Sequence, residues 1–258
     1  MQRYFMHLSY CGAPFHGWQT QPNAPSVQQT IEQALATMMR FPVRITGAGR
    51  TDTGVNARSM VAHFDLPAPL PDPAQTVRSL NALVGRDIAI HSLTPVHPEA
   101  HARFDATSRT YHYYALPCKS PFFHRLAWQA PPVLDYEAMN RAAALLLDTS
   151  DFTSFAKLHT DVKTNICRVT HAQWHPVADT GARVFVITAD RFLRNMVRAV
   201  VGTLVEVGRG KMDLQGFADV IADRNRCSAG TSMPAQALYL WDVTYPYYTP
   251  PTDMDLRD

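Results

Sequence analysis

Arginine and aspartate lie two residues apart in the turn-forming segment "GAGRTDTGVNARSMVAHFD", residues 47–65. The carboxylate of Asp52 can act as a nucleophile, and the guanidinium of Arg50 can bind a phosphate or a base. The apolar stretches "VRIT" and "MVAHF" on either side favour two strands joined by a short loop that carries both residues. An aspartate in a loop more often caps its own backbone, so the chemical interpretation of Asp52 needs support from other residues.

A second candidate lies within the apolar segment "RFLRNMVRAVVGTLVEVGRG". This pattern predicts one long, largely buried helix with Arg191, Arg194 and Arg198 on one face. Arg198 is surrounded by valine and alanine, and because a guanidinium keeps its proton, it needs an anionic partner. That partner is either a structural carboxylate, such as Asp190 or Glu206, or a catalytic carboxylate that Arg198 keeps ionised and oriented.

Aromatic residues supply a third signal. The predicted strand "SRTYHYYAL" contains Tyr111, Tyr113 and Tyr114, and ordinary core packing accounts for the last two. A tyrosine that faces a cleft with arginines nearby can stack on an unpaired base. The loop "YCGAPFHGWQTQ" combines aromatic rings with imidazole and amide groups that suit nucleotide contacts, and Gln19 is our candidate from it.

Three familiar motifs fail here. "GAGRTD" lacks the third glycine of a dinucleotide-binding loop and precedes a strand rather than a helix. "DTG" occurs twice, as in aspartic proteases, but the copy at 179–181 fits a hairpin turn better. The eleven histidines show no H-E-x-x-H or similar spacing, which favours structural or surface roles over metal binding.

Hydrophobic periodicity predicts the strands and helices that must position these residues. Their order along the chain is roughly β-α-β-β-α-β, and a similar set follows. This order indicates an α+β fold of two halves joined near Ala102–Thr107, with largely antiparallel or mixed sheets. We divide the chain into residues 1–104, 105–245 and a flexible tail at 246–258. Strands are expected at residues 3–11, 43–47, 59–66, 87–96, 108–116, 167–177, 183–190 and 237–245, and helices at 26–40, 73–84, 135–147, 191–210 and 214–225.

Composition limits the class of protein. The 258 residues are 46% hydrophobic and 18% charged, which suits a folded protein with a substantial core. The chain shows no apolar run of membrane-spanning length, and "MQRYFMHLSYCG" lacks the features of a secretory signal. The four cysteines form no C-x-x-C pair, so we expect buried thiols in a cytoplasmic protein. Most of the 24 basic residues are arginine, which mildly favours RNA or phosphate ligands.

Four segments in order resemble the tRNA pseudouridine synthase A family over nearly the whole chain. They are "YCGAPFHGWQTQ", "GAGRTDTGVNA", "SRTYHYYAL" and "RFLRNMVRAVVGTLVEVGRGK" followed by "GTSMPAQALYLWDVTY". The resemblance implies two RRM-like α/β halves that form a mixed, mainly antiparallel sheet flanked by helices, with a central RNA-binding cleft. It also implies isomerisation of uridine to pseudouridine at positions 38 to 40 of the tRNA anticodon arm, by a cytoplasmic homodimer that uses no metal or organic cofactor.

The resemblance also implies roles for single residues. Asp52 matches the nucleophile, Arg198 the helix arginine that pairs with it, and Tyr111 the tyrosine that stacks on the target base. Arg50 matches an arginine that helps to hold the flipped nucleotide, and Arg194 and Gln19 are further candidates for substrate binding. The residues leave open whether the carboxylate attacks C1′ or C6 and which group later removes the C5 proton.

Two positions depart from the family loop, which commonly reads R-T-D-A-G-V-H-A. Thr53 replaces the alanine and Asn56 the histidine, which puts the preferred substrate position in question but not the reaction type. The alternatives are a tRNA-binding or folding protein without catalysis and another RNA enzyme such as a nuclease. A metal-dependent nuclease needs clustered carboxylates, and near Asp52 the sequence offers only Asp65.

Overall fold

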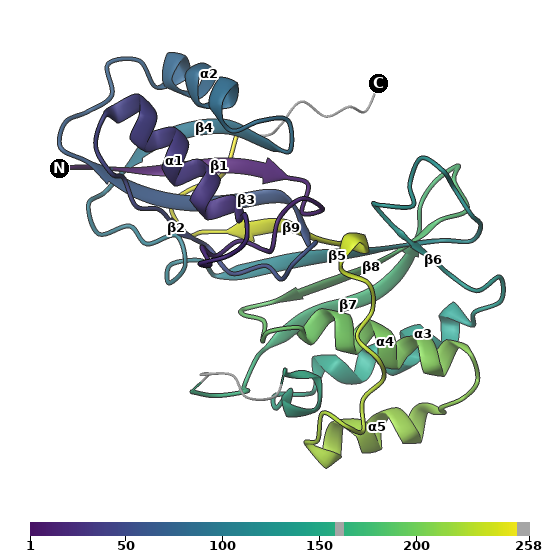
Figure 1. Cartoon of the computed structure of the whole chain (residues 1–258). Coiled ribbons are helices and arrows are strands. Elements are labelled where there is room, and N and C mark those ends of the chain that lie inside the picture. Colours follow the sequence, from purple (N-terminus) through teal and green to yellow (C-terminus); the bar gives the residue numbers. More distant parts are fainter. Residues whose placement is uncertain (158–162, 252–258) are drawn as a thin grey trace. The chain divides into compact units, whose positions relative to one another are not determined.

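The computed structural model describes residues 1–157 and 163–251, which form two compact units (Figure 1). Unit 1 comprises Met1–Thr107 and the chain from Leu240 onward, and unit 2 comprises Ser108–Tyr239. The three-part division expected from the sequence stays a prediction, and residues 252–258 of the expected tail lie outside the described residues. Within the described part of that tail, Tyr248 is buried. Its ring packs edge-on against that of Phe5, with 5.1 Å between the ring centroids.

Unit 1 has two layers, an antiparallel sheet and two helices. The antiparallel strands run in the order β4-β1-β3, β2 pairs with β3, and α1 and α2 lie on one face of the sheet (Figure 1). The predicted β-α-β-β-α-β order is therefore confirmed for this unit. Its elements are β1 (Gln2–Tyr10), α1 (Val27–Met39), β2 (Thr46–Gly47), β3 (Asn56–Leu66), α2 (Pro73–Leu83) and β4 (Ile88–Val96), with β9 (Leu238–Thr244) beside β3.

Helix α1 begins where the sequence predicts it. The Ser26 hydroxyl accepts a hydrogen bond from the backbone N–H of Gln29 at 3.2 Å, which satisfies one free donor of the first turn. Val27, Ile31 and Leu35 follow at helical spacing and are fully buried. The helix is thereby fixed on the sheet by its apolar face, and its polar face is free to hold neighbouring loops.

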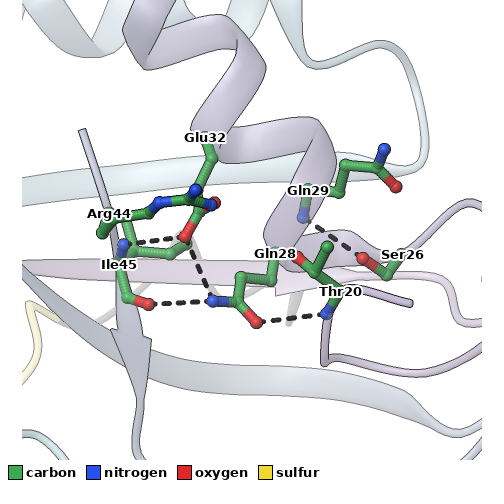
Figure 2. Close-up of polar contacts among 7 residues, drawn as sticks. All are labelled: Thr20, Ser26, Gln28, Gln29, Glu32, Arg44 and Ile45. Atoms are coloured by element: carbon green, nitrogen blue, oxygen red, sulfur yellow. Dashed lines mark hydrogen bonds and ion pairs between the residues drawn. The ribbon is translucent and has the colours of Figure 1, made fainter. Parts of the chain in front are cut away.

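Two polar side chains of α1 hold the segments that flank the Asp52 loop (Figure 2). The buried Glu32 carboxylate accepts from the backbone N–H of Ile45 at 3.0 Å and from the guanidinium of Arg44 at 2.8 Å. Gln28 donates to the carbonyl of Ile45 at 3.1 Å and accepts from the N–H of Thr20 at 3.2 Å. One helix therefore anchors both the 11–20 loop and the chain that enters β2.

Unit 2 follows the expected order with an additional short strand and an additional helix, as β-β-α-β-β-α-α. The antiparallel strands run β5-β8-β7, β6 pairs in parallel with β5, and the helices lie on one side of this sheet (Figure 1). With unit 1, this confirms the predicted mixed, mainly antiparallel α+β class, whereas the central cleft stays a prediction. The elements are β5 (Ser108–Leu116), β6 (Trp128–Gln129), α3 (Tyr136–Ala144), η1 (Leu145–Leu147), η2 (Thr153–Phe155), β7 (Val169–Pro176), β8 (Arg183–Ala189), α4 (Met196–Gly208), α5 (Leu214–Asp223) and η3 (Ala235–Ala237).

The second "DTG" forms the hairpin turn that the sequence predicts. The N–H of Val177 donates to the carbonyl of Ala182 at 2.9 Å across the turn that joins β7 to β8. Asp179 and Gly181 both have positive φ, of 58° and 66°, as tight turns require. The aspartic-protease interpretation therefore has no support at this position.

The prediction of one long helix from residue 191 is wrong at its N-terminus. Helix α4 begins at Met196, after Asn195 in the left-handed region at φ 65°. The carboxylate of Asp190 accepts from the backbone N–H groups of Arg191 and Arg168, which holds the preceding segment in a non-helical conformation. Arg191 and Arg194 therefore do not share a helix face with Arg198.

A buried histidine of unit 1 couples stability to pH. His63 in β3 is 8% exposed, and its Nδ1 accepts a hydrogen bond from the N–H of Ala102 at 3.1 Å. Burial, followed by the nearby charges of His101 and Arg3, lowers the pKa of His63 to about 4. A proton on Nδ1 also removes the acceptor that Ala102 uses.

We expect the free energy of unfolding to fall as the pH drops from 6.5 towards 4, because the unfolded chain then binds a proton that folded His63 does not. The contribution is complete above pH 6.5 and is about 3 kcal/mol across this interval. Urea unfolding at several pH values measures it. His63→Gln keeps an acceptor without titrating, so an equally steep pH dependence in this variant would contradict the assignment.

Candidate active site

The Asp52 loop is a tight turn between β2 and β3. The N–H of Val55 donates to the carbonyl of Asp52 at 3.1 Å, and Gly54 has φ 78°, which glycine adopts without strain. The Asp52 side chain is half-buried, whereas Arg50 and Thr53 are exposed. The loop therefore holds one carboxylate at the rim of the core and one guanidinium in solvent.

The 11–20 loop packs directly on this turn, so two motifs far apart in sequence form one structure. The N–H of Trp18 donates to the carbonyl of Thr51 at 3.2 Å, and the N–H of Gly54 donates to the carbonyl of Phe15 at 3.3 Å. The hydroxyl groups of Tyr10 and Thr51 form a hydrogen bond of 2.9 Å, and both residues are buried. These contacts fix the backbone on both sides of Asp52.

Glycines make this close approach possible. A Cβ on Gly12 would lie 2.2 Å from the carbonyl oxygen of Val55, and one on Gly17 would lie 2.5 Å from that of Thr51. Gly17 also has φ 90°. Side chains at these two positions are therefore incompatible with the observed packing of the two loops.

Asn56, which departs from the family loop, joins the same two loops. Its side-chain oxygen accepts a hydrogen bond from the N–H of Gly12 at 2.8 Å, and the residue is 2% exposed. A buried donor that loses its acceptor costs about 1–3 kcal/mol. The sequence shows the substitution but gives no signal for this bond, because nothing in the local pattern pairs residue 56 with residue 12.

We expect Asn56→Ala to lower the free energy of unfolding by about 2 kcal/mol, since the Gly12 N–H then remains buried without an acceptor. Thermal unfolding measures the effect. Asn56→His restores a ring nitrogen that can accept, and it should recover part of the loss. Equal stability of Asn56→Ala and the unaltered chain would show that the hydrogen bond between Asn56 and Gly12 does not stabilise the fold.

Tyr111 and Arg198 lie towards the same face of the unit 2 sheet. Tyr111 and Tyr113 share one face of β5 because side chains alternate along a strand. The half-buried ring of Tyr111 packs edge-on against the ring of Phe192, with 5.0 Å between the ring centroids. Tyr113 is fully buried, which confirms its core role; burial raises its pKa, and the nearby charge of Arg198 opposes that rise.

The Arg198 side chain is held by backbone, not by either carboxylate that we named. Its Nε donates to the carbonyl of Met233 at 2.5 Å, and the Met233 N–H donates to the carbonyl of Arg198 at 3.1 Å. Glu206 instead pairs with Arg209 at 2.9 Å. Asp190 accepts from two backbone N–H groups. Met233, for which the sequence gives no local signal, therefore orients the guanidinium.

The structure assigns the predicted residues to two groups. Asp52, Arg50 and Gln19 belong to unit 1, where Gln19 is exposed and follows Trp18 of the packed loop. Tyr111, Arg198 and Arg194 belong to unit 2. Arg194 is exposed, and its carbonyl accepts from the N–H of Lys157 at 3.0 Å. Their joint role in one site stays a prediction.

Within residues 1–157 and 163–251, no three or more His, Cys, Asp or Glu side chains are grouped so that they could hold a metal ion. In the same described ranges, no helix has the length and apolar character needed to cross a bilayer.

Comparison with known proteins identifies close relatives. A family model described as tRNA pseudouridine synthase matches residues 142–246. Proteins named tRNA pseudouridine synthase A from Parabacteroides distasonis and Porphyromonas gingivalis are each 58% identical to this chain over 95% of its length, and the alignments cover 97% and 98% of those proteins. The protein of that name from Neisseria meningitidis is 40% identical over 95% of this chain and 92% of its own. A solved structure of Thermus thermophilus Cse3 bound to RNA aligns at 12% identity over 81% of this chain and 97% of that chain, with a TM-score of 0.23 that is too low to support an argument.

Proposed function

This chain belongs to the tRNA pseudouridine synthase A family, and we propose that it isomerises uridine to pseudouridine at positions 38, 39 and 40 of the tRNA anticodon arm. The observation that carries the proposal is 58% identity to relatives of that name over 95% of the chain. The reaction breaks the bond between N1 and C1′, rotates the uracil and joins C5 to C1′. The C5 proton is lost to water and the freed N1 gains a proton, so the overall change is an isomerisation.

We assign the chemistry to three side chains. Asp52 acts as the nucleophile, because a carboxylate that forms a covalent intermediate divides the base exchange into easier steps. Arg198 pairs with the Asp52 carboxylate and keeps it ionised. Tyr111 stacks on the target uracil and offsets part of the cost of flipping it out of the RNA. The backbone bonds around Asp52 and Arg198 support these roles, because they hold both residues before substrate arrives.

Three exposed or loop residues bind the RNA around that nucleotide. We assign Arg50 to the flipped nucleotide, since it is exposed two residues from Asp52. Arg194 and Gln19 contact substrate from the segments before α4 and after Trp18. We further propose a cytoplasmic homodimer in which tRNA contacts both subunits; the resemblance to the family is its support.

Mapping of the product tests the proposed positions. Unmodified tRNA transcripts with uridine at 38, 39 or 40, or with cytidine at all three, are incubated with the protein and probed for pseudouridine by primer extension after carbodiimide treatment. We expect new stops only where one of the three positions carries uridine. Modification elsewhere would overturn the position assignment, with Thr53 and Asn56 the first residues to exchange for the family residues.

A tRNA-binding protein without catalysis is the remaining alternative. It predicts tight tRNA binding that does not depend on Asp52 and no pseudouridine in any transcript. Identity to relatives named as synthases disfavours it.

A further inference from the structure

We propose that the exposed loop from Lys119 to Arg125, here called the 119–125 loop, is a second tRNA contact that stacks an unpaired base on Phe122 and binds the phosphates beside it. The inference rests on the proposed function, because it takes tRNA as the substrate. It concerns a surface outside the residues assigned to the target uridine.

Two large apolar side chains of this loop lie in solvent. Phe122 is 82% exposed and Phe123 is 52% exposed, although both occur in a unit with a well-filled core. Burying an aromatic ring is favourable, so an exposed pair on one short loop marks a surface that binds something. The loop joins β5 to β6 within unit 2 (Figure 1).

Hydrogen bonds within the loop fix the backbone around Phe123. The N–H of Phe123 donates to the hydroxyl of Ser120 at 3.3 Å, and the N–H groups of Leu126 and Ala127 donate to the carbonyl of Phe123 at 2.9 and 3.0 Å. The hydroxyl of Tyr239 donates to the carbonyl of Leu126 at 2.9 Å, which ties the end of the loop to the unit. A loop whose backbone is already held loses less entropy when a ligand binds.

Charge favours RNA as the occupant. Lys119, His124 and Arg125 are exposed around the two rings, and no Asp or Glu occurs between residues 106 and 134. The neighbouring hairpin turn, where Gly181 approaches Pro117, brings one acidic residue, Asp179. Aromatic rings interleaved with cations are typical of surfaces that bind single-stranded nucleic acid.

Distance separates this contact from the target nucleotide. Tyr111 lies five residues before Leu116, the last residue of β5, and a strand rises about 3.3 Å per residue. The 119–125 loop begins beyond that end, more than about 16 Å along the strand from Tyr111. A base stacked on Phe122 is therefore a different nucleotide from the one on Tyr111.

Binding measurements with a full-length tRNA transcript test the proposal. We expect Phe122→Ala to weaken the Kd for tRNA about tenfold, Phe122→Leu to weaken it similarly because it lacks a π face, and Phe122→Tyr to retain the affinity. Lys119→Ala with Arg125→Ala should reduce the slope of log affinity against log salt by about 1.5, since each cation releases counterions. Val133→Ala, at an apolar residue of unit 2 that is 83% exposed, is the matched control and should change neither quantity.

Each outcome decides between the alternatives. Unchanged tRNA affinity in Phe122→Ala, with an active unaltered protein, overturns the inference and leaves the proposed function intact. Retained affinity in Phe122→Leu overturns the stacking contact. Sedimentation velocity on the same variants shows whether Phe122→Ala instead separates subunits, in which case the loop is a protein interface. An inactive unaltered protein overturns the proposed function itself.

Discussion

Replacement of Asp52 by asparagine is expected to lower the single-turnover rate of pseudouridine formation by more than about a thousandfold. The amide has nearly the shape of the carboxylate but is not a nucleophile at neutral pH. The bonds that hold the loop, between Val55 and Asp52 and between Gly54 and Phe15, use backbone atoms and survive the change. The measurement is a rapid-quench time course with enzyme in excess over tRNA.

Thr53→Ala is the matched control for this prediction. Thr53 is the exposed neighbour of Asp52, and the substitution introduces the residue that the family loop commonly carries. We expect its rate to stay within about threefold of the unaltered protein. If Asp52→Asn retains more than about a tenth of the rate while Thr53→Ala behaves as expected, another group performs the attack.

Gly202→Ala is expected to destabilise unit 2 by about 3 kcal/mol and to lower Tm by about 8 °C. A Cβ at Gly202 in α4 would lie 1.8 Å from the carbonyl oxygen of Thr231, which is backbone and cannot turn aside. The segment that must move includes Met233, whose carbonyl accepts from Nε of Arg198. We therefore expect a fall in kcat larger than any change in KM, because Arg198 loses its orientation.

Gly216→Ala in α5 provides the control. The nearest atom to a Cβ there is the Cγ of Met212 at 3.0 Å, which belongs to a flexible side chain and not to backbone. Alanine also favours a helix over glycine, so stability should be unchanged or slightly higher. Equal Tm values for Gly202→Ala and Gly216→Ala, measured by calorimetry, would refute the close approach of α4 and the 231–233 segment.

Local signals predicted much of the fold. The Ser26 cap, the apolar spacing of α1 and the turn residues around Asp179 each act over a few residues, so the sequence alone reveals them. The predicted start of α4 at residue 191 was wrong for two reasons. Asn195 adopts a left-handed conformation, and the carboxylate of Asp190 accepts a hydrogen bond from the backbone N–H of Arg191. Apolar periodicity does not detect such a local competitor for helical hydrogen bonds.

Residue type and spacing in the sequence predicted the candidate site residues. They did not predict the hydrogen bonds that hold these residues in place. Asp52 and Tyr111 stand in recognisable motifs, whereas Asn56 bonds Gly12 across 44 residues and Arg198 bonds Met233 across 35. Tertiary packing brings these pairs together, and no periodic pattern in the sequence predicts such contacts. Gly12, Gly17 and Gly202 were the available signals, because glycine at a close contact marks backbone approaching backbone.

Release of tritium to water from tRNA transcripts labelled at C5 of uracil tests the central claim most directly, because only replacement of the C5–H bond by the new C5–C1′ bond frees the label. We predict release by the unaltered protein in amounts equal to new pseudouridine at positions 38 to 40, and none above background with Asp52→Asn. Intact tRNA binding without any tritium release would contradict the assignment as a pseudouridine synthase and would favour a protein that binds tRNA without modifying it.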